Sequence, residues 1–357
     1  MIGSINSKKT TINAMMKEWL ESIFVVGYEK WQEIQSVNYP YSNITILQQF
    51  EVLEIPQKIV IKKANPENNF DISTSNIKVE SAALRRLKEI SGIQEVRTPE
   101  IYGVNEKLCC IAMEHVDGQR IINYLLEFPL KTLLGKIEIE KYQEKMYNLG
   151  KWLKAMHSEI TPNIIDEKEL ERSLKRDKEG IEKRVNYLGE IRNKDFPEKT
   201  GDEIISRVTS LIKKMVEKPP ALKAVHGDFS LVNILLQPPK IYVVDFTSFG
   251  PGLPEDDLAR IYLDFKNIDE YTFRLRPKKK GSFTWPFFEG YGGKIEIRNP
   301  YTQFYLIKHA LINLYMYRVN MGRENFLNPL LCRVLYSTQK SFLKKIMNDQ
   351  VYEWMKN

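Results

Sequence analysis

Four polar residues around a short apolar hairpin constrain this chain more than any other feature. One residue separates His226 from Asp228, four more separate Asp228 from Asn233, and Asp245 ends the next apolar run. Between Asn233 and Asp245, two short apolar segments flank a Gln-Pro-Pro-Lys sequence at 237–240, which is typical of a turn. We therefore predict a hairpin with Asn233 at its start and Asp245 at its end.

This set of side chains suits phosphoryl transfer from a nucleotide. That reaction needs a carboxylate facing the attacking hydroxyl and oxygen ligands that hold Mg²⁺ against the phosphates. The spacing matches the kinase catalytic loop His-Arg-Asp-x-x-x-x-Asn, with Gly227 in place of the arginine. We interpret Asp228 as the catalytic base, or as the carboxylate that orients the acceptor hydroxyl, and expect His226 to lock the loop by hydrogen bonds to neighbouring backbone. Asn233 and Asp245 are the predicted Mg²⁺ ligands.

A lysine at the end of an apolar strand is the predicted phosphate contact. Lys62 follows the apolar residues 59–61, as the lysine of the kinase Val-Ala-Ile-Lys segment does. Lys63 competes for this role, and we favour Lys62, because neighbouring strand residues point to opposite faces and only one can reach the phosphates. Glu80 on the next helix is expected to hold the lysine in an ion pair, with an exposed helix glutamate as the alternative.

The phosphate-covering loop has no familiar glycine motif. Neither Gly-x-Gly-x-x-Gly nor a Walker-type Gly-x-x-x-x-Gly-Lys-Ser/Thr segment occurs. Residues 40–43 precede the first predicted strand instead, and the polar groups of Ser42 and Asn43 could contact phosphate there. A plain turn is the alternative for this segment.

Composition is compatible with an intracellular enzyme of two modest domains or lobes. The chain has 357 residues, 43% of them apolar, and only three cysteines. No apolar run approaches the ~18 residues of a membrane span, and no signal peptide is apparent, so we predict a cytoplasmic protein. The net charge of +7 is interleaved with acidic residues, which disfavours a nucleic-acid partner. The sharpest basic cluster, at 274–280, is interpreted as a solvated loop or an anion-binding substrate loop.

Apolar periodicity predicts an α+β chain with a β-rich N-terminal lobe and a mostly helical C-terminal lobe. Helices are expected over residues 12–36, 78–90, 142–157, 168–188 and 202–216, and from 301 onwards. Strands are expected over 44–53, 58–63, 101–104, 108–114, 234–236 and 241–244, with a loop over 65–76. The predicted domains are a helical extension at 1–39, a nucleotide-binding lobe at 40–116, and a catalytic and acceptor-binding lobe at 117–357.

Together these residues resemble the aminoglycoside phosphotransferase and choline kinase family, which are small-molecule relatives of the protein kinases. The likeness covers about residues 40–295 and is strongest at 226–235, 243–246 and 253–259. Gly227 and Thr247 resemble the residues that this family carries at the corresponding positions, whereas protein kinases place arginine and glycine there. Residues 1–39, 168–199 and 274–280 match no part of the family.

The resemblance implies a bilobal, protein-kinase-like fold with ATP between the lobes. Adenine would bond the Glu114 carbonyl and the Val116 N–H of a hinge strand. Ser42 and Asn43 would stand where protein kinases carry their glycine loop. Asp257 would have a structural part at a helix start, where a carboxylate also suits the helix dipole.

We predict an ATP- and Mg²⁺-dependent phosphotransferase that phosphorylates a hydroxyl of a small molecule, such as a sugar, an amino alcohol or an aminoglycoside-like compound. Because an aminoglycoside needs an acidic pocket, the basic charge of this chain favours a neutral or anionic acceptor. The alternatives are a kinase of a protein or lipid-linked acceptor, and a non-catalytic nucleotide-binding regulatory protein. The presence of Lys62, Asp228, Asn233 and Asp245 argues against the last of these.

Overall fold

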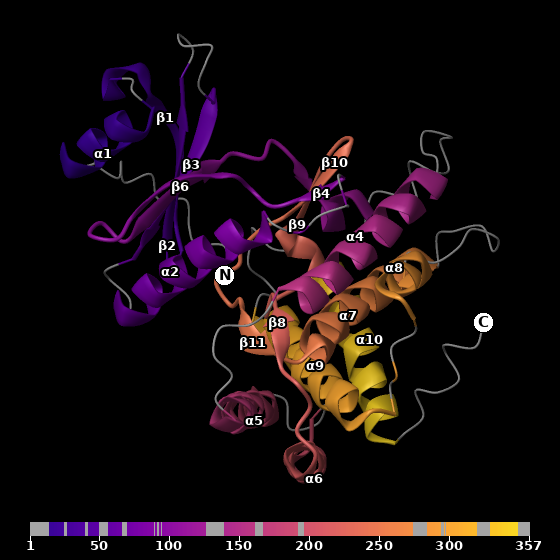
Figure 1. Cartoon of the computed structure of the whole chain (residues 1–357). Helices are drawn as coiled ribbons and strands as arrows, with labels where there is room; N and C mark the ends of the chain where they lie inside the picture. Colours follow the sequence, from indigo (N-terminus) through magenta and orange to yellow (C-terminus); the bar gives the residue numbers. More distant parts are fainter. Residues whose placement is uncertain are drawn as a thin grey trace. The chain divides into compact units, whose positions relative to one another are not determined.

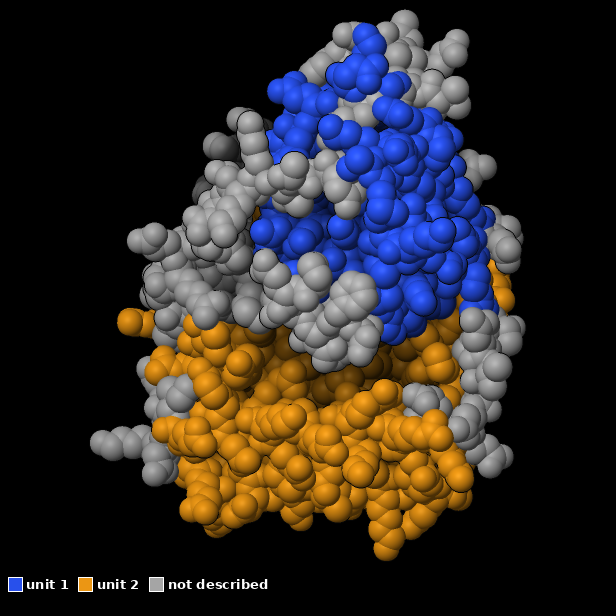
Figure 2. Space-filling model, turned by 90° about the vertical axis from the view of Figure 1, so that its left-hand side faces the viewer, with its two compact units in different colours: residues 1–119, 233–249 blue, residues 120–232, 250–357 orange. Residues whose placement is uncertain are grey.

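The chain divides into two compact units, each built from two stretches of sequence (Figure 2). Unit 1 comprises Met1–Gln119 and Asn233–Phe249, and unit 2 comprises Arg120–Val232 and Gly250–Asn357. The computed structural model describes residues 14–24, 27–39, 42–49, 56–65, 70–88, 90, 93, 95–125, 139–160, 167–191, 196–273, 284–293, 296, 298–319 and 329–348. The predicted basic loop at 274–280 lies outside these residues.

Unit 1 contains a five-stranded antiparallel sheet in the order β1-β2-β3-β6-β5 (Figure 1). Its strands are β1 (Gln32–Asn38), β2 (Ser42–Gln48), β3 (Lys58–Ala64), β5 (Ile101–Asn105) and β6 (Cys110–Glu114). Helix α1 (Ala14–Phe24) buries Leu20 against one face of this sheet, together with Leu47 and Ile59. The opposite face is therefore the one available to functional side chains in this unit.

The helix expected over residues 12–36 is wrong beyond Phe24, because the chain forms β1 from Gln32 onwards. The helical spacing of Trp31 has another origin. Its ring packs 5.3 Å from that of Phe24 in the α1 cluster, while the residues that follow pair with β2. Strand pairing outweighs the weak local helix signal here, so residues 1–39 are not a purely helical extension.

Helix α2 (Phe70–Leu87) is longer than expected at its N-terminal end. The loop predicted over residues 65–76 is wrong from Phe70 onwards, where polar residues continue the helix instead. Packing against β3, β5 and β6 stabilises α2, and tertiary contacts commonly override low helix propensity. The expected strand at 44–53 ends at Gln48.

The predicted hairpin is confirmed as β9 (Ile234–Gln237) and β10 (Lys240–Val243). Strand β10 also pairs in parallel with β4 (Val96–Arg97) of the same unit. Two further short elements are the strand β7 (Gln119–Arg120) and the 3₁₀-helix η1 (Tyr28–Lys30). The hairpin therefore belongs to unit 1, in a sheet separate from the five-stranded one, although it is far from the rest of unit 1 in sequence.

Unit 2 is mostly helical, as expected (Figure 1). Its helices are α4 (Ile139–Glu159), α5 (Glu167–Ile191), α6 (Glu198–Glu217), α7 (Pro254–Phe273), α8 (Thr284–Tyr291), α9 (Pro300–Val319) and α10 (Pro329–Met347). Helix α9 is buried on most sides, with α5, α6, α7 and α10 packed around it, which is typical of a central helix. An antiparallel pair, β8 (Lys223–Val225) and β11 (Gly250–Gly252), flanks the loop that begins at His226. None of the helices described has the length and apolarity to cross a membrane.

Candidate functional site

The amine of Lys62 is held between two carboxylates of unit 1. Nζ lies 2.7 Å from Glu80 Oε2 on α2 and 3.0 Å from Asp245 Oδ1, just after β10. The side chains of Lys62 and Glu80 are 7% and 2% exposed, so this ion pair is buried. Burial alone lowers the pKa of Lys62, but the two carboxylates outweigh it and raise that pKa above its ordinary value. The expected contact between Lys62 and Glu80 is present, with Asp245 as an additional partner.

Strand register distinguishes Lys62 from Lys63. Lys62 is paired with Ile44 on β2, and Lys63 is paired with Asn43. Directly paired residues point to the same face of a sheet, so Asn43 lies on the face opposite to Lys62. Ser42 is paired with Ala64 and shares the Lys62 face.

Ser42 and Asn43 belong to the turn between β1 and β2 and to the start of β2, rather than to a segment before the first strand. The N–H of Tyr39 donates a 2.8 Å hydrogen bond to the carbonyl of Ser42, which closes this turn. Within the described part of the chain, Asn43 Oδ1 is buried without a hydrogen-bond partner. Face and register therefore favour Ser42 over Asn43 as a phosphate contact, and both roles stay predictions.

Asn233 and Asp245 lie at the same end of the β9–β10 hairpin. Ile234 is paired with Val243, and the N–H of Val244 donates a 2.9 Å hydrogen bond to the carbonyl of Asn233. Asp245 adopts a φ of 68°, in the left-handed region that Asp tolerates better than most residues. The hairpin thus brings the backbones of Asn233 and Asp245 to neighbouring positions within unit 1.

These two side chains fit Mg²⁺ chemically. Mg²⁺ prefers hard oxygen ligands and usually combines one or two carboxylates with water and substrate phosphates. No group of three or more His, Cys, Asp or Glu side chains that could hold a metal occurs among the residues described. The Asn233 and Asp245 pair is therefore the candidate, and it suits a cation that arrives together with phosphate oxygens.

Glu114 ends β6 and ties the hairpin to the sheet of unit 1. Its Oε1 accepts a 3.0 Å hydrogen bond from the Tyr242 hydroxyl on β10, and its Oε2 accepts one of 3.1 Å from the N–H of Glu100. Burial, with a contribution from Glu114, raises the pKa of Tyr242 to about 12. Val116 follows in a stretch without regular structure. The adenine contacts expected at Glu114 and Val116 involve main-chain groups and stay predictions.

Asp257 holds the start of the loop at 226–233. Its Oδ2 accepts a 2.7 Å hydrogen bond from the N–H of His226, and its Oδ1 accepts one of 2.9 Å from the N–H of Gly227. The same Oδ2 lies 3.0 Å from Nε2 of His157, whose Nδ1 is 2.9 Å from the Tyr291 hydroxyl. Asp257 therefore acts structurally mainly by accepting hydrogen bonds from the backbone of this loop, rather than by its place at the start of α7.

The carboxylate of Asp228 is half-exposed and contacts an arginine. Arg260 Nε donates a 3.3 Å hydrogen bond to Asp228 Oδ1. The N–H of Asp228 donates to Nδ1 of His226 at 3.3 Å, so His226 contacts neighbouring backbone, as expected. Further along the loop, the N–H of Leu231 donates to Asp264 Oδ2 at 2.9 Å. Sequence reasoning missed Arg260 and Asp264, although their spacing from Asp257 indicates one face of a helix.

The predicted site residues are distributed over both units. Asp228 belongs to unit 2, whereas Asn233 and Asp245 belong to unit 1. The short 3₁₀-helix η2 (Leu231–Asn233) follows Asp228 within the same loop. Convergence of Asp228 with the two metal-ligand candidates around one nucleotide stays a prediction.

A partly buried charge cluster in unit 2 was not predicted. Lys308 Nζ on α9 lies 3.0 Å from Asp177 Oδ2 on α5 and 3.1 Å from Asp256 Oδ2 on α7. His309 Nε2 lies 2.6 Å from Asp256 Oδ1. Although burial acts to raise it, Lys308 and His309 lower the pKa of Asp256 to about 2. Burial raises the pKa of Asp177, so the two carboxyls are shifted in opposite directions.

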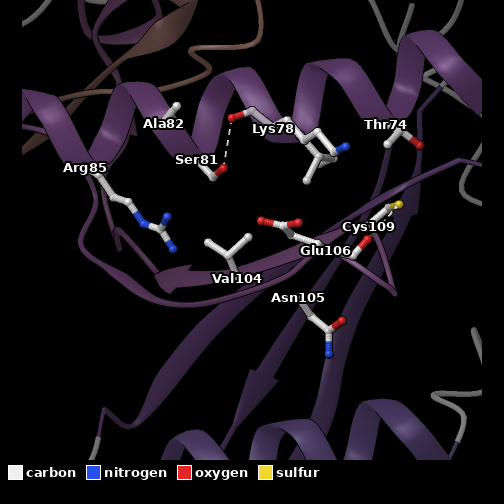
Figure 3. A pocket seen from close by; sticks show the side chains of 10 residues that line it. Thr74, Lys78, Ser81, Ala82, Arg85, Val104, Asn105, Glu106 and Cys109 are labelled. Carbon is white, nitrogen blue, oxygen red and sulfur yellow. Dashed lines mark hydrogen bonds between the residues drawn. The ribbon is translucent and has the colours of Figure 1, made fainter.

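A hollow of about 250 Å³ in unit 1 lies between α2 and the turn after β5 (Figure 3). Ser81 and Arg85 of α2 lie on one side of it, and Val104 of β5 and Glu106 of the turn lie on the other. None of the predicted site residues lines this hollow, so it is separate from the candidate site.

Residues 58–291 match the family model described as the phosphotransferase enzyme family. Among solved structures, the chain is similar to the ADP-bound aminoglycoside phosphotransferase APH(2'')-Ib, with 17% identity, a TM-score of 0.51, and coverage of 94% of this chain and 99% of that one. The Plasmodium vivax ethanolamine kinase has 15% identity and a TM-score of 0.53, over 98% of this chain and 94% of that one.

A glucosamine kinase in complex with glucosamine, ADP and inorganic phosphate has 13% identity and a TM-score of 0.57, over 90% of this chain and 83% of that one. No curated protein sequence matches the chain. At these identities the likeness shows the fold alone. It confirms the predicted α+β, protein-kinase-like fold.

Proposed function

Because the chain belongs to the phosphotransferase enzyme family, we propose that it transfers the γ-phosphoryl group of ATP to a hydroxyl of a small molecule. The observation that carries this proposal is the buried amine of Lys62, held between Glu80 and Asp245. A lysine ammonium is a compact point charge that binds phosphate. Its two carboxylate partners fix its position before a nucleotide arrives, and such preorganisation is the main protein contribution to phosphoryl transfer.

The nucleotide roles follow from the residues of unit 1. Lys62 contacts phosphate oxygens, and Ser42 on the same sheet face is the favoured second contact. The main-chain groups of Glu114 and Val116 bond adenine. Asn233 and Asp245 hold Mg²⁺, which neutralises phosphate charge when it is bound. The fold shared with the ADP-bound phosphotransferase supports ATP as the donor.

Asp228 orients the acceptor in this proposal. The acceptor hydroxyl donates a hydrogen bond to the Asp228 carboxylate while its oxygen attacks the γ-phosphorus. The bond from that phosphorus to the β–γ bridging oxygen breaks, and ADP leaves with the bonding electron pair. The hydroxyl proton passes to Asp228 and from there to water. Because the transition state is loose, the position of this carboxylate matters more than its basicity.

An acceptor panel tests this function directly. We expect ATP, Mg²⁺ and the protein to give ADP and a phosphorylated product with at least one compound among ethanolamine, glucosamine, gentamicin and neutral or phosphorylated sugars. Mass spectrometry identifies the product, and coupled ADP release gives its rate. The first three compounds represent the chemistry of solved relatives, and the sugars represent the neutral or anionic acceptors that the basic charge favours.

Asp228→Ala is the decisive variant, and it should reduce kcat by at least about 10²-fold, the scale of one positioned acid–base group. Asp202→Ala, which removes an exposed carboxylate on α6, is the matched control and should keep full activity. If Asp228→Ala turns over normally, Asp228 is not the orienting carboxylate. A rise in melting temperature with ATP and Mg²⁺, without product from any acceptor, would favour the non-catalytic alternative.

A further inference from the structure

One face of α7 follows the catalytic loop along its length. Asp257, Arg260 and Asp264 are spaced by three and four residues, which places them on one side of the helix. Asp257 accepts the N–H groups at the start of the loop, and Asp264 accepts the N–H of Leu231 near its end. Arg260 lies between these two anchors in the helix, and it contacts a side chain of the loop rather than its backbone.

Arg260 is itself fixed at two points. Its Nε donates to Asp228 Oδ1 at 3.3 Å, and its Nη1 donates to Asn313 Oδ1 on α9 at 2.7 Å. The side chain of Arg260 is 14% exposed, compared with 48% for Asp228. Because the guanidinium is planar, two hydrogen bonds in different directions define its orientation. The largely buried and oriented guanidinium of Arg260 therefore contacts the half-exposed carboxylate of Asp228.

Arg260 keeps its positive charge in this environment. Burial alone lowers its pKa, but the carboxylates of Asp264 and Asp228 outweigh burial and raise that pKa. The two backbone anchors fix the path of the loop but leave the side-chain torsions of Asp228 undetermined. Arg260 differs from these anchors in that it contacts the Asp228 carboxylate itself.

We propose that Arg260 is a positioning residue that holds the Asp228 carboxylate in the orientation required by the acceptor hydroxyl. This inference rests on the proposed function. Asn313 of α9 holds the guanidinium of Arg260, so side chains from α7 and α9 together orient the Asp228 carboxylate. The role requires both the charge and the fork-like donor geometry of arginine, and lysine therefore replaces it only in part.

The kinetic test compares Arg260→Met and Arg260→Lys with the wild-type protein, by ADP release with the acceptor panel and, without acceptor, by phosphoryl transfer to water. A displacement of about 1 Å at a reacting group can cost about 10²-fold in rate, so we expect kcat of Arg260→Met to fall by that factor. The KM for ATP should change by less than about twofold, because the nucleotide contacts are in other residues. Arg260→Lys should retain an intermediate kcat.

Chemical rescue separates positioning from folding. Arg260→Ala should regain turnover when guanidinium is added at concentrations too low to unfold the protein. Arg207→Met is the matched control, since Arg207 of α6 also donates to a side chain of α9, at 2.8 Å to Gln303 Oε1. It should keep kcat, and guanidinium should not accelerate it.

A double variant completes the test. In the Asp228→Ala background, Arg260→Met should cause no further loss of kcat, because coupled residues give non-additive effects. An active wild-type protein whose Arg260→Met variant keeps kcat, or whose two substitutions multiply, would overturn this inference alone. A wild-type protein that turns over no ATP under any of these conditions would overturn the proposed function and this inference together.

Discussion

The candidate residues of the two units are held in different ways. In unit 1, candidate side chains bind one another, since Lys62 Nζ contacts both Glu80 and Asp245. In unit 2, a carboxylate of α7 binds loop backbone, as Asp257 accepts the N–H groups of His226 and Gly227. Removal of a side chain therefore has a different consequence in each unit.

In unit 1, the loss of Lys62 leaves the buried carboxylate of Glu80 without its charged partner while the strands stay in register. In unit 2, the loss of an anchor releases backbone N–H groups, so the effect spreads along the loop to Asp228. The comparison predicts that substitutions in unit 1 act mainly on nucleotide affinity. Substitutions of the α7 anchors should act mainly on kcat and stability.

Asp257→Ala should have the largest effect. The substitution leaves two loop N–H groups and His157 without their buried acceptor, so we expect the free energy of unfolding to fall by about 3–5 kcal/mol. We expect kcat of the folded fraction to fall by at least about 10²-fold, because Asp228 is no longer held in place. Urea denaturation and ADP release measure the two quantities.

The exposed control Asp202→Ala should change the free energy of unfolding by less than about 0.5 kcal/mol. Unchanged stability in Asp257→Ala would mean that the loop backbone does not depend on this carboxylate. The contrast between the two units would then be lost.

Lys62→Met tests the prediction for unit 1. It should weaken ATP binding by about tenfold or more, equivalent to about 1.4 kcal/mol. Lys63→Met is the matched control, because Lys63 lies on the opposite face of β3, and it should change the dissociation constant by less than about twofold. Isothermal titration calorimetry with ATP and Mg²⁺ provides both values. Equal losses in the two variants would contradict the assignment of the phosphate-contacting lysine by register.

Local patterns in the sequence were sufficient to predict the hairpin and the Lys62–Glu80 pair. The hairpin depends on two apolar segments around a proline-rich turn, and all of these features lie within about ten residues, the range in which turn chemistry is informative. The Lys62–Glu80 pair depends on a strand followed by a helix, and this order resembles the kinase strand that carries the phosphate-contacting lysine. Both predictions required little knowledge of distant contacts.

The remaining contacts could not be predicted because they join segments that are far apart in the sequence. Asp257 reaches His226 from 31 residues away, and Lys308 reaches Asp177 across 131 residues. No local periodicity specifies such pairs. The helix expected over residues 12–36 was wrong from Gln32 onwards for a related reason, since pairing of β1 with β2 depends on a neighbouring strand rather than on the residues of β1 alone.

Acid titration of the charge cluster gives the smallest expected effect. Asp256 has a folded-state pKa of about 2 against an ordinary value of 3.8, so its contribution to stability is present above about pH 4. That contribution is lost as the pH falls towards 2. The shift corresponds to a change in the free energy of unfolding on the order of 2 kcal/mol.

Asp256→Asn isolates this contribution from other acidic groups. The difference in free energy of unfolding between wild type and variant should shrink as the pH falls from about 4 to 2. Asp256 contributes to the raised pKa of Asp177, so both proteins in this comparison carry Asp177→Asn. A difference that stays constant with pH would show that Lys308 and His309 do not stabilise the ionised carboxylate. The cluster would then differ from the Lys62 site of unit 1, where the charged partners stabilise one another.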